Sequence, residues 1–169
     1  MADVDGDGGA GAGRESEEII PSSVDELTHA ELRSVYDDSV RSILFAKGQQ
    51  WRTVGATLVL FLALVALVRF VSVSEQFVDL IKVVIILSGT GALFVIVIYQ
   101  FWQHTEAKKI GGVTSYFSNV FRKVRGLKSE LEANVHRYVL LLVMFTLIVL
   151  GGYIAITAIN LVLPPGVVR

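Results

Sequence analysis

Long apolar runs without charged residues are the main pattern of this sequence. The longest covers residues 139–163, and two shorter runs cover residues 53–68 and 83–101. A helix rises about 1.5 Å per residue and the hydrocarbon core of a bilayer is about 30 Å thick, so the longest run can cross it with some tilt. The pattern predicts an all-α membrane protein with three transmembrane helices, at residues 53–71, 83–101 and 139–163.

The segment before the first run, residues 23–52, is predicted to form an amphipathic cytoplasmic helix. Its apolar side chains recur at mostly helical intervals, and its charged side chains fall on other faces. Ser23 and Glu26 have the spacing of a capping box, which predicts that the helix begins there. Gly48 is a candidate for a bend near the membrane surface, because glycine destabilises a helix interior by about 1 kcal/mol relative to alanine.

A second amphipathic cytoplasmic helix is predicted within residues 102–138. Its apolar residues follow spacings of three and four: Phe117, Val120, Val124, Leu127 and Leu131. Gly111 and Gly112 predict a break before this helix, which can continue into the last crossing with a weak point at Gly126. We expect the two amphipathic helices to pair as a short cytoplasmic hairpin.

The remaining segments are predicted to be irregular. Residues 1–22 combine Asp, Glu, Gly and Ala with few apolar side chains, a composition that predicts a disordered acidic N-terminal tail. Residues 72–82 are expected to form a short external loop, and residues 164–169 an external tail. Three crossings, two amphipathic helices and this tail complete the predicted architecture.

Charge is distributed unevenly, although the net charge is only −1. Residues 1–52 hold eleven acidic and five basic side chains, whereas residues 102–138 hold three acidic and seven basic ones. Basic residues near membrane ends favour the cytoplasmic side, and a cytoplasmic N-terminus leaves only Arg69, Lys82 and Arg169 outside. We therefore expect a multi-pass protein of the plasma membrane, the inner membrane of a bacterium, with its C-terminus external.

Small residues in the second and third runs are candidates for helix packing or oligomerisation. The spacings Ser88 to Ala92 and Gly151 to Ala155 fit the small-x-x-x-small pattern that lets helix backbones approach closely. The candidate residues are Ser88, Gly89, Gly91, Ala92, Gly151, Gly152 and Ala155. The pattern leaves open whether they pack helices of one chain or join copies into a homo-oligomer.

Basic and aromatic residues near the membrane ends are candidates for surface contacts. The basic cluster Arg122, Lys123, Arg125 and Lys128 lies beside an apolar stripe, which suits either anionic lipid headgroups or a protein partner. The cluster is too small and too close to the bilayer for a nucleic-acid role. A second set is predicted to anchor the helices in the headgroup region of the bilayer. This set comprises Gln49, Gln50, Trp51, Arg52 and Trp102.

Few residues suggest chemistry. The sequence has no cysteine, which excludes disulfides and cysteine-based metal sites. Membrane-embedded enzymes and ion-coupled transporters usually place ionisable groups inside their crossings, and the cores of the predicted crossings hold none. His104 and His136 fall at helix ends, which favours ordinary interfacial contacts over a shared metal or haem, because haem ligands lie inside apolar bundles. We expect no enzymatic activity, no cofactor and no metal.

Residues 43–51, with the sequence ILFAKGQQW, follow Tyr36 and resemble the segment that leads into the membrane in small uncharacterised bacterial multi-pass proteins. The overall layout of cytoplasmic helix, closely spaced crossings and further cytoplasmic helix is similar to that of SLATT-type proteins, which are proposed pore-forming effectors. The third crossing departs from that plan. Neither resemblance implies catalytic residues.

These features predict a non-enzymatic scaffold, assembly factor or regulatory accessory subunit. The alternative is a homo-oligomeric channel or membrane-permeabilising effector, in which polar side chains of the crossings line a narrow path. The candidate lining residues are Thr57, Ser88, Thr90, Thr146 and Asn160.

Overall fold

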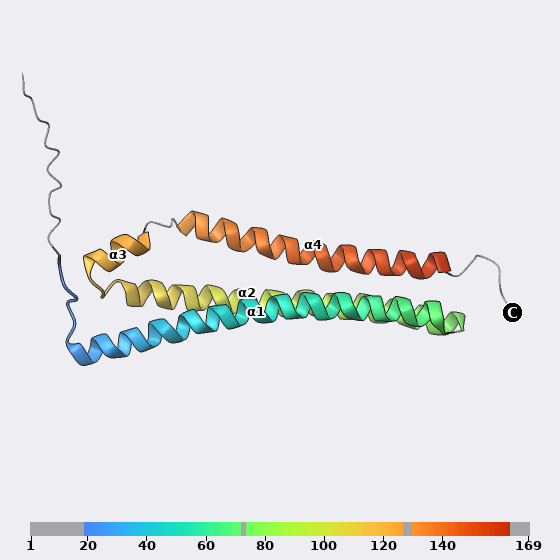
Figure 1. Ribbon diagram of the computed structural model, residues 1–169, viewed down its shortest axis with the longest axis horizontal. Coiled ribbons are helices and arrows are strands. Elements are labelled where there is room, and N and C mark those ends of the chain that lie inside the picture. Colours follow the sequence, from blue (N-terminus) through green and yellow to red (C-terminus); the bar gives the residue numbers. More distant parts are fainter. Residues whose placement is uncertain (1–18, 72–73, 127–129, 163–169) are drawn as a thin grey trace, which may run out of the picture.

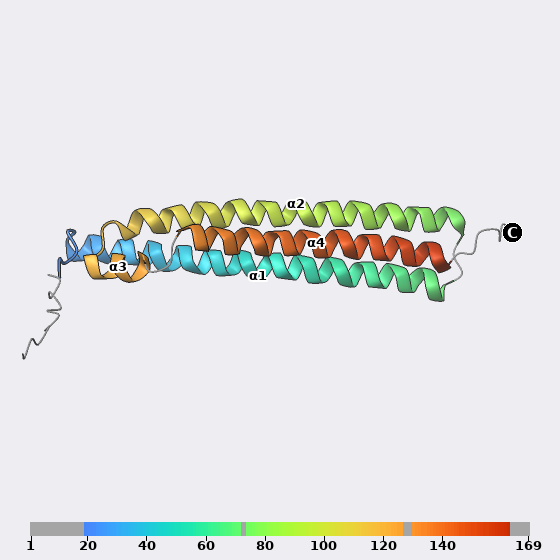
Figure 2. The ribbon, with the colours of Figure 1, turned by 90° about the horizontal axis from the view of Figure 1, so that it is seen from above.

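The computed structural model describes residues 19–71, 74–126 and 130–162, and this part of the chain folds into four helices. They are α1 (Glu26–Phe70), α2 (Glu75–Thr114), α3 (Asn119–Gly126) and α4 (Glu130–Val162). The long helices α1, α2 and α4 lie side by side, with α2 antiparallel to the other two (Figures 1 and 2). The short helix α3 lies at the end of the bundle where α1 begins and α2 ends (Figure 1).

Helix α1 begins later than the capping-box pattern predicts. Its N-cap is Asp25, whose carboxylate accepts hydrogen bonds from the Thr28 amide at 3.0 Å and from the Thr28 hydroxyl at 2.7 Å. The start predicted at Ser23 is therefore wrong, because a charged carboxylate nearer the helix satisfies its first amides. The helix then runs through Gly48 without interruption, so the predicted amphipathic helix and the first crossing form one continuous element.

Helix α2 is longer at both ends than the crossing predicted at residues 83–101. Ser74 caps its start by accepting a hydrogen bond from the Phe77 amide at 3.4 Å. At the other end the helix passes through Gly111 and Gly112, so the break predicted there is wrong. Buried Ile110 and Val113 flank the glycines, and their packing offsets the poor helix propensity of glycine.

The segment 102–138 is not one amphipathic helix. It is divided between the end of α2, the separate helix α3 and the beginning of α4. Helix α3 ends at Gly126, where the sequence predicts a weak point. The break before α3 follows Thr114, where the amides of Ser115, Tyr116 and Phe117 each bond to a carbonyl three residues back.

The core of the bundle is narrow, and most apolar surface points outward. Buried residues of α1, α2 and α4 form two clusters, one around Phe61 and Ile85 and one around Val54, Ile96 and Ile148. Three helices are long and apolar enough to cross a membrane, yet only 22%, 28% and 17% of their most apolar windows are buried. So much exposed apolar surface suits a lipid environment, and it indicates a membrane protein.

Candidate functional site: a polar seam and an extramembrane helical layer

A pair of buried glutamines joins α1 to α2 where both helices leave their apolar stretches. Gln103 Nε2 donates to Gln50 Oε1 at 2.7 Å, while Gln50 Nε2 donates to the Ile96 carbonyl at 3.0 Å and to Gln100 Oε1 at 3.4 Å. Gln50 is 3% exposed and Gln103 is 1% exposed. The prediction that Gln50 lies among headgroups is therefore wrong, because its amide bonds to the neighbouring helix instead.

This contact fixes how α1 and α2 are aligned along their length. If one helix slid past the other by a turn, two buried amides would lose their partners, at a cost of about 1–3 kcal/mol for each unsatisfied group. Single buried polar pairs set register in the same way in packed helices of other proteins. Apolar contacts alone would allow several alignments of α1 and α2, and the glutamine pair therefore selects one of them.

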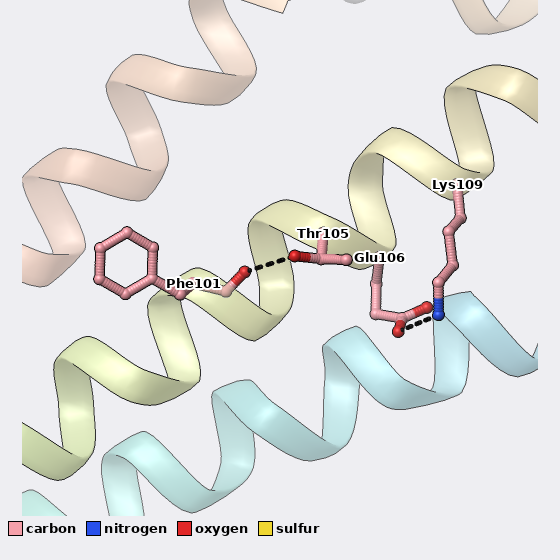
Figure 3. A network of polar contacts seen from close by, with 4 residues as sticks. All are labelled: Phe101, Thr105, Glu106 and Lys109. Atoms are coloured by element: carbon pink, nitrogen blue, oxygen red, sulfur yellow. Dashed lines mark hydrogen bonds and ion pairs between the residues drawn. The ribbon is translucent and has the colours of Figure 1, made fainter.

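One turn further along α2, a buried carboxylate is paired with an exposed lysine. Glu106 is only 6% exposed, and its Oε1 lies 2.7 Å from Lys109 Nζ. Figure 3 shows both side chains directed toward α1, with Thr105 bonded back to the Phe101 carbonyl of its own helix. The hydrogen bond from Lys109 lowers the pKa of Glu106 below 4.5, against the opposing effect of burial and with further help from Ser39 and Trp102. Glu106 is thus held as a carboxylate beyond the apolar stretch of α2.

Aromatic side chains attach α3 to the beginning of α1. The Phe117 ring centroid lies 5.2 Å from that of His29 and 6.3 Å from that of Tyr36, and Phe121 meets Tyr36 edge-on at 5.9 Å. Arg125 lies over the Tyr36 ring at 5.7 Å and bonds to the Tyr36 hydroxyl at 3.4 Å. Offset and edge-on aromatic pairs contribute about 0.5–1.5 kcal/mol each beyond area burial. These contacts bring the two predicted amphipathic segments together.

The segment before α1 forms hydrogen bonds with the turn that leads into α3. The Ile20 amide donates to Asn119 Oδ1 at 3.1 Å, and the Asn119 amide donates to the Ile20 carbonyl at 3.3 Å. The Ser22 hydroxyl donates to the Tyr116 carbonyl at 3.0 Å. Residues 20–22 therefore lie along the turn between α2 and α3, although the sequence predicts disorder up to residue 22.

Most of the predicted small residues pack helices within the chain. A Cβ added at Gly151 would lie 2.5 Å from Leu58 Cδ2, and those added at Gly89 and Gly152 would lie 3.4 and 3.5 Å from the Phe61 ring. Ala92 and Ala155 are buried in the two core clusters. Gly91 differs, because it is exposed and a Cβ there meets nothing within 4 Å. Ser88 is half-buried and donates to the Val84 and Ile85 carbonyls.

The predicted surface residues lie mostly on the outside. Trp51 is 45% exposed and Trp102 is 41% exposed, and Trp102 stacks on Tyr99 at 6.0 Å. Arg52, Arg122 and Lys123 are exposed, and Arg125 is exposed while it covers Tyr36. Lys128 lies outside the described residues.

The residues proposed to line a channel do not share one face of the chain. Thr57 is buried and donates to the Thr53 carbonyl, whereas Thr90, Thr146 and Asn160 are exposed. His104 and His136 are both exposed at the bundle surface. Within the part of the chain that the structure describes, no group of three or more His, Cys, Asp or Glu residues is arranged to hold a metal.

Sequence reasoning missed Ser39, Gln103 and Glu106 as interface residues. Gln103 and Glu106 continue the three-and-four spacing of buried positions that includes Ile96, Ile110 and Val113. That spacing was the signal in the sequence from which these α2 interface residues could have been predicted, and it continues well past the end of the apolar stretch.

Comparison with known proteins adds no relative. No protein-family model, curated protein or solved structure matches this chain. The resemblances to bacterial multi-pass proteins and to the SLATT-type layout therefore stay predictions. The chain itself offers three apolar helices, a glutamine pair that fixes two of them, and a helical layer beyond the apolar stretches.

Proposed function

We propose that this protein is a non-enzymatic membrane scaffold or accessory subunit that presents a rigid helical layer to a protein partner. The observation that carries the proposal is continuity: α1 and α2 pass from their apolar stretches into polar extensions without a break, and Gln50 and Gln103 join them at that point. The Glu106–Lys109 ion pair and the α3 contacts continue the layer outward. Such an arrangement suits positioning a partner rather than performing chemistry.

The proposed layer is large enough to hold a partner away from the bilayer. Residues 26–52 of α1 extend about 40 Å beyond the apolar stretch, and residues 103–114 of α2 extend about 18 Å, at the rise of an α-helix. Buried positions recur at spacings of seven and four along the α1 extension and of three and four along the α2 extension, which favours coiled-coil packing. Helix α3 is attached at the far end of the α2 extension, which favours a protein partner over lipid headgroups as its target.

The outer face of α3 is the proposed partner surface. Val120 is 45% exposed and Val124 is 63% exposed, one helical turn apart, and the exposed Lys123, three residues after Val120, adjoins them. An exposed apolar pair with a basic neighbour suits a partner helix that carries an apolar stripe and acidic residues. Phe117 does not belong to this surface, because it is 9% exposed and packs on His29 and Tyr36.

Co-purification tests the proposal. The full-length protein is solubilised from its own membrane and its partners are identified by mass spectrometry, for the wild type and for Val120→Ser with Val124→Ser. We expect one fixed partner to be lost in the double variant and retained in Val35→Ser, a control that is also 45% exposed. Partner recovery that is equal in all three proteins contradicts the proposal.

We propose a plasma-membrane location, the bacterial inner membrane, with the N-terminus and the helical layer on the cytoplasmic side. Basic residues support this orientation, because Arg33, Arg41 and Lys109 lie on the extensions, while the opposite end of the bundle carries Arg69 and Lys82. Cysteines introduced at Glu75 and Val124 can be labelled in intact cells with an impermeant reagent. Label is expected at position 75 only, and label at position 124 would reverse the orientation.

A further inference from the structure

Helix α4 carries a polar stripe on the face that the rest of the bundle leaves uncovered. Thr146, Tyr153 and Asn160 recur at intervals of seven residues, and Thr157 lies between the last two. All four are exposed, with Tyr153 at 68%. The packed residues of α4 occupy another face and comprise Met144, Ile148, Ala155 and Ile159. At 100° per residue, the centre of the stripe lies roughly opposite the centre of the packed face.

The stripe lies at hydrocarbon depth. Tyr153 is roughly 13 Å from Val162 at one end of the apolar stretch and roughly 21 Å from Val139 at the other, at the helical rise per residue. Side chains of a helix lean toward its N-terminus, which for Tyr153 is the longer way out of the bilayer. Aromatic residues that anchor at the membrane surface lie nearer the headgroups than this.

Three of these four side chains have no hydrogen-bond partner among the described residues. Thr146 donates to the Leu142 carbonyl at 2.9 Å and is satisfied within its helix. Within the described residues, the Tyr153 and Thr157 hydroxyls and the Asn160 amide form no hydrogen bond. Lipid tails offer neither donors nor acceptors, so polar groups that face them are disfavoured unless another helix covers them.

We infer that this face of α4 pairs with α4 of a second copy of the chain. All copies insert with the same orientation, so two such helices meet in parallel about a two-fold axis, and each stripe residue faces its own counterpart. Hydroxyls and amides suit this arrangement because each both donates and accepts hydrogen bonds. The same face has a shallow, open depression lined by Phe145, Thr146, Val149, Leu150 and Tyr153, on which side chains of the second copy can pack.

The inference rests on the membrane placement of α4 and not on the scaffold function. The α4 stripe and the α3 partner surface are separate, so a failure of one leaves the other intact. It also differs from a small-residue oligomerisation face, because Gly89, Gly151 and Gly152 are already used inside the bundle.

Cysteine cross-linking tests the pairing, and the absence of native cysteine makes single-cysteine variants simple to prepare. Purified full-length Thr146→Cys and Tyr153→Cys are reconstituted in lipid vesicles and oxidised with copper phenanthroline. Ile154→Cys is the matched control, since Ile154 is 56% exposed and is turned about 100° from Tyr153. We expect a disulfide-linked dimer at positions 146 and 153 and several-fold less at 154. Equal yields at 153 and 154, or monomer throughout, would overturn the inference.

The strength of pairing provides a second measurement. Tyr153→Phe removes only the hydroxyl, and its combination with Asn160→Leu removes two of the three polar groups that lack a hydrogen bond among the described residues. We expect the dimer dissociation constant in vesicles, measured by energy transfer on lipid dilution, to rise about threefold in the single variant and about tenfold in the double variant. Thr90→Val, which changes an exposed polar residue of α2, should leave it unchanged. Cross-linking of α4 in native membranes to a different protein, with the purified chain monomeric, would also overturn pairing with a second copy.

Discussion

Replacing Gln103 by leucine should destabilise the bundle through the group that it leaves behind. Gln103 donates the 2.7 Å hydrogen bond to Gln50 Oε1, and Gln50 is only 3% exposed, so the substitution buries an oxygen without a donor. A buried unsatisfied polar atom costs about 1–3 kcal/mol in soluble proteins, and hydrogen bonds between membrane helices average about 0.6 kcal/mol with a maximum of about 1.7. We expect Gln103→Leu to lower the free energy of unfolding by about 1–2 kcal/mol.

The double variant separates the hydrogen bond from the loss of side-chain packing. Gln50→Leu with Gln103→Leu replaces both amides by apolar side chains, so neither partner is left unsatisfied. We expect the double variant to lose less stability than the sum of the two single variants, by about 1 kcal/mol. Gln49→Leu is the matched control: its half-buried side chain forms no hydrogen bond within the described residues, and its effect should stay within about 0.5 kcal/mol.

Reversible unfolding by dodecyl sulfate in mixed micelles measures these free energies. Trp51 and Trp102 lie next to the glutamine pair in sequence, and their fluorescence reports its separation. Strict additivity of the two single substitutions would refute the coupling that we assign to Gln50 and Gln103. If Gln49→Leu lowered the free energy of unfolding as much as Gln103→Leu, the loss would not be specific to the hydrogen-bonded pair.

Three further predictions concern other contacts. Gly151→Leu should destabilise the bundle by about 1–3 kcal/mol through overpacking against Leu58 and Phe61, whereas Gly91→Leu should be neutral; thermal unfolding in detergent compares the two. Because the pKa of Glu106 is lowered on folding, its contribution to the free energy of unfolding should be present above pH 4.5 and lost as the pH falls through the folded-state pKa. The unfolding midpoint of the wild type should therefore drop more on acidification than that of Glu106→Gln. Tyr36→Ala should weaken the attachment of α3 to α1 by about 2 kcal/mol without unfolding the membrane helices. Faster hydrogen exchange confined to residues 116–125 would support this, and an unchanged exchange rate would contradict it.

The local sequence pattern was sufficient to predict the three apolar helices, but it did not predict where they begin and end. Hydropathy predicts three crossings because transfer of apolar side chains into lipid depends on composition, and the structure has three helices of the required length and hydropathy. The start at Asp25 and the continuation through Gly111 and Gly112 depend on competing caps and on the packing of Ile110 and Val113. The burial of Ile110 and Val113 needs segments distant in sequence, which a local pattern does not contain, whereas the Asp25 cap is a local contact with Thr28 that competes with the capping-box pattern at Ser23.

The candidate sites divide in the same way. The sequence by itself determined membrane residence and the supply of small residues, because both follow from the identity of the side chains along one helix. Only the tertiary structure decided that Gly151 and Gly152 pack around Phe61, that Gln50 meets Gln103, and that Tyr153 and Asn160 face outward. The physical reason is rotation and alignment: a helix offers all its faces to a neighbour, and the choice among them is made by packing and hydrogen bonds between helices, which exist only once the bundle has formed.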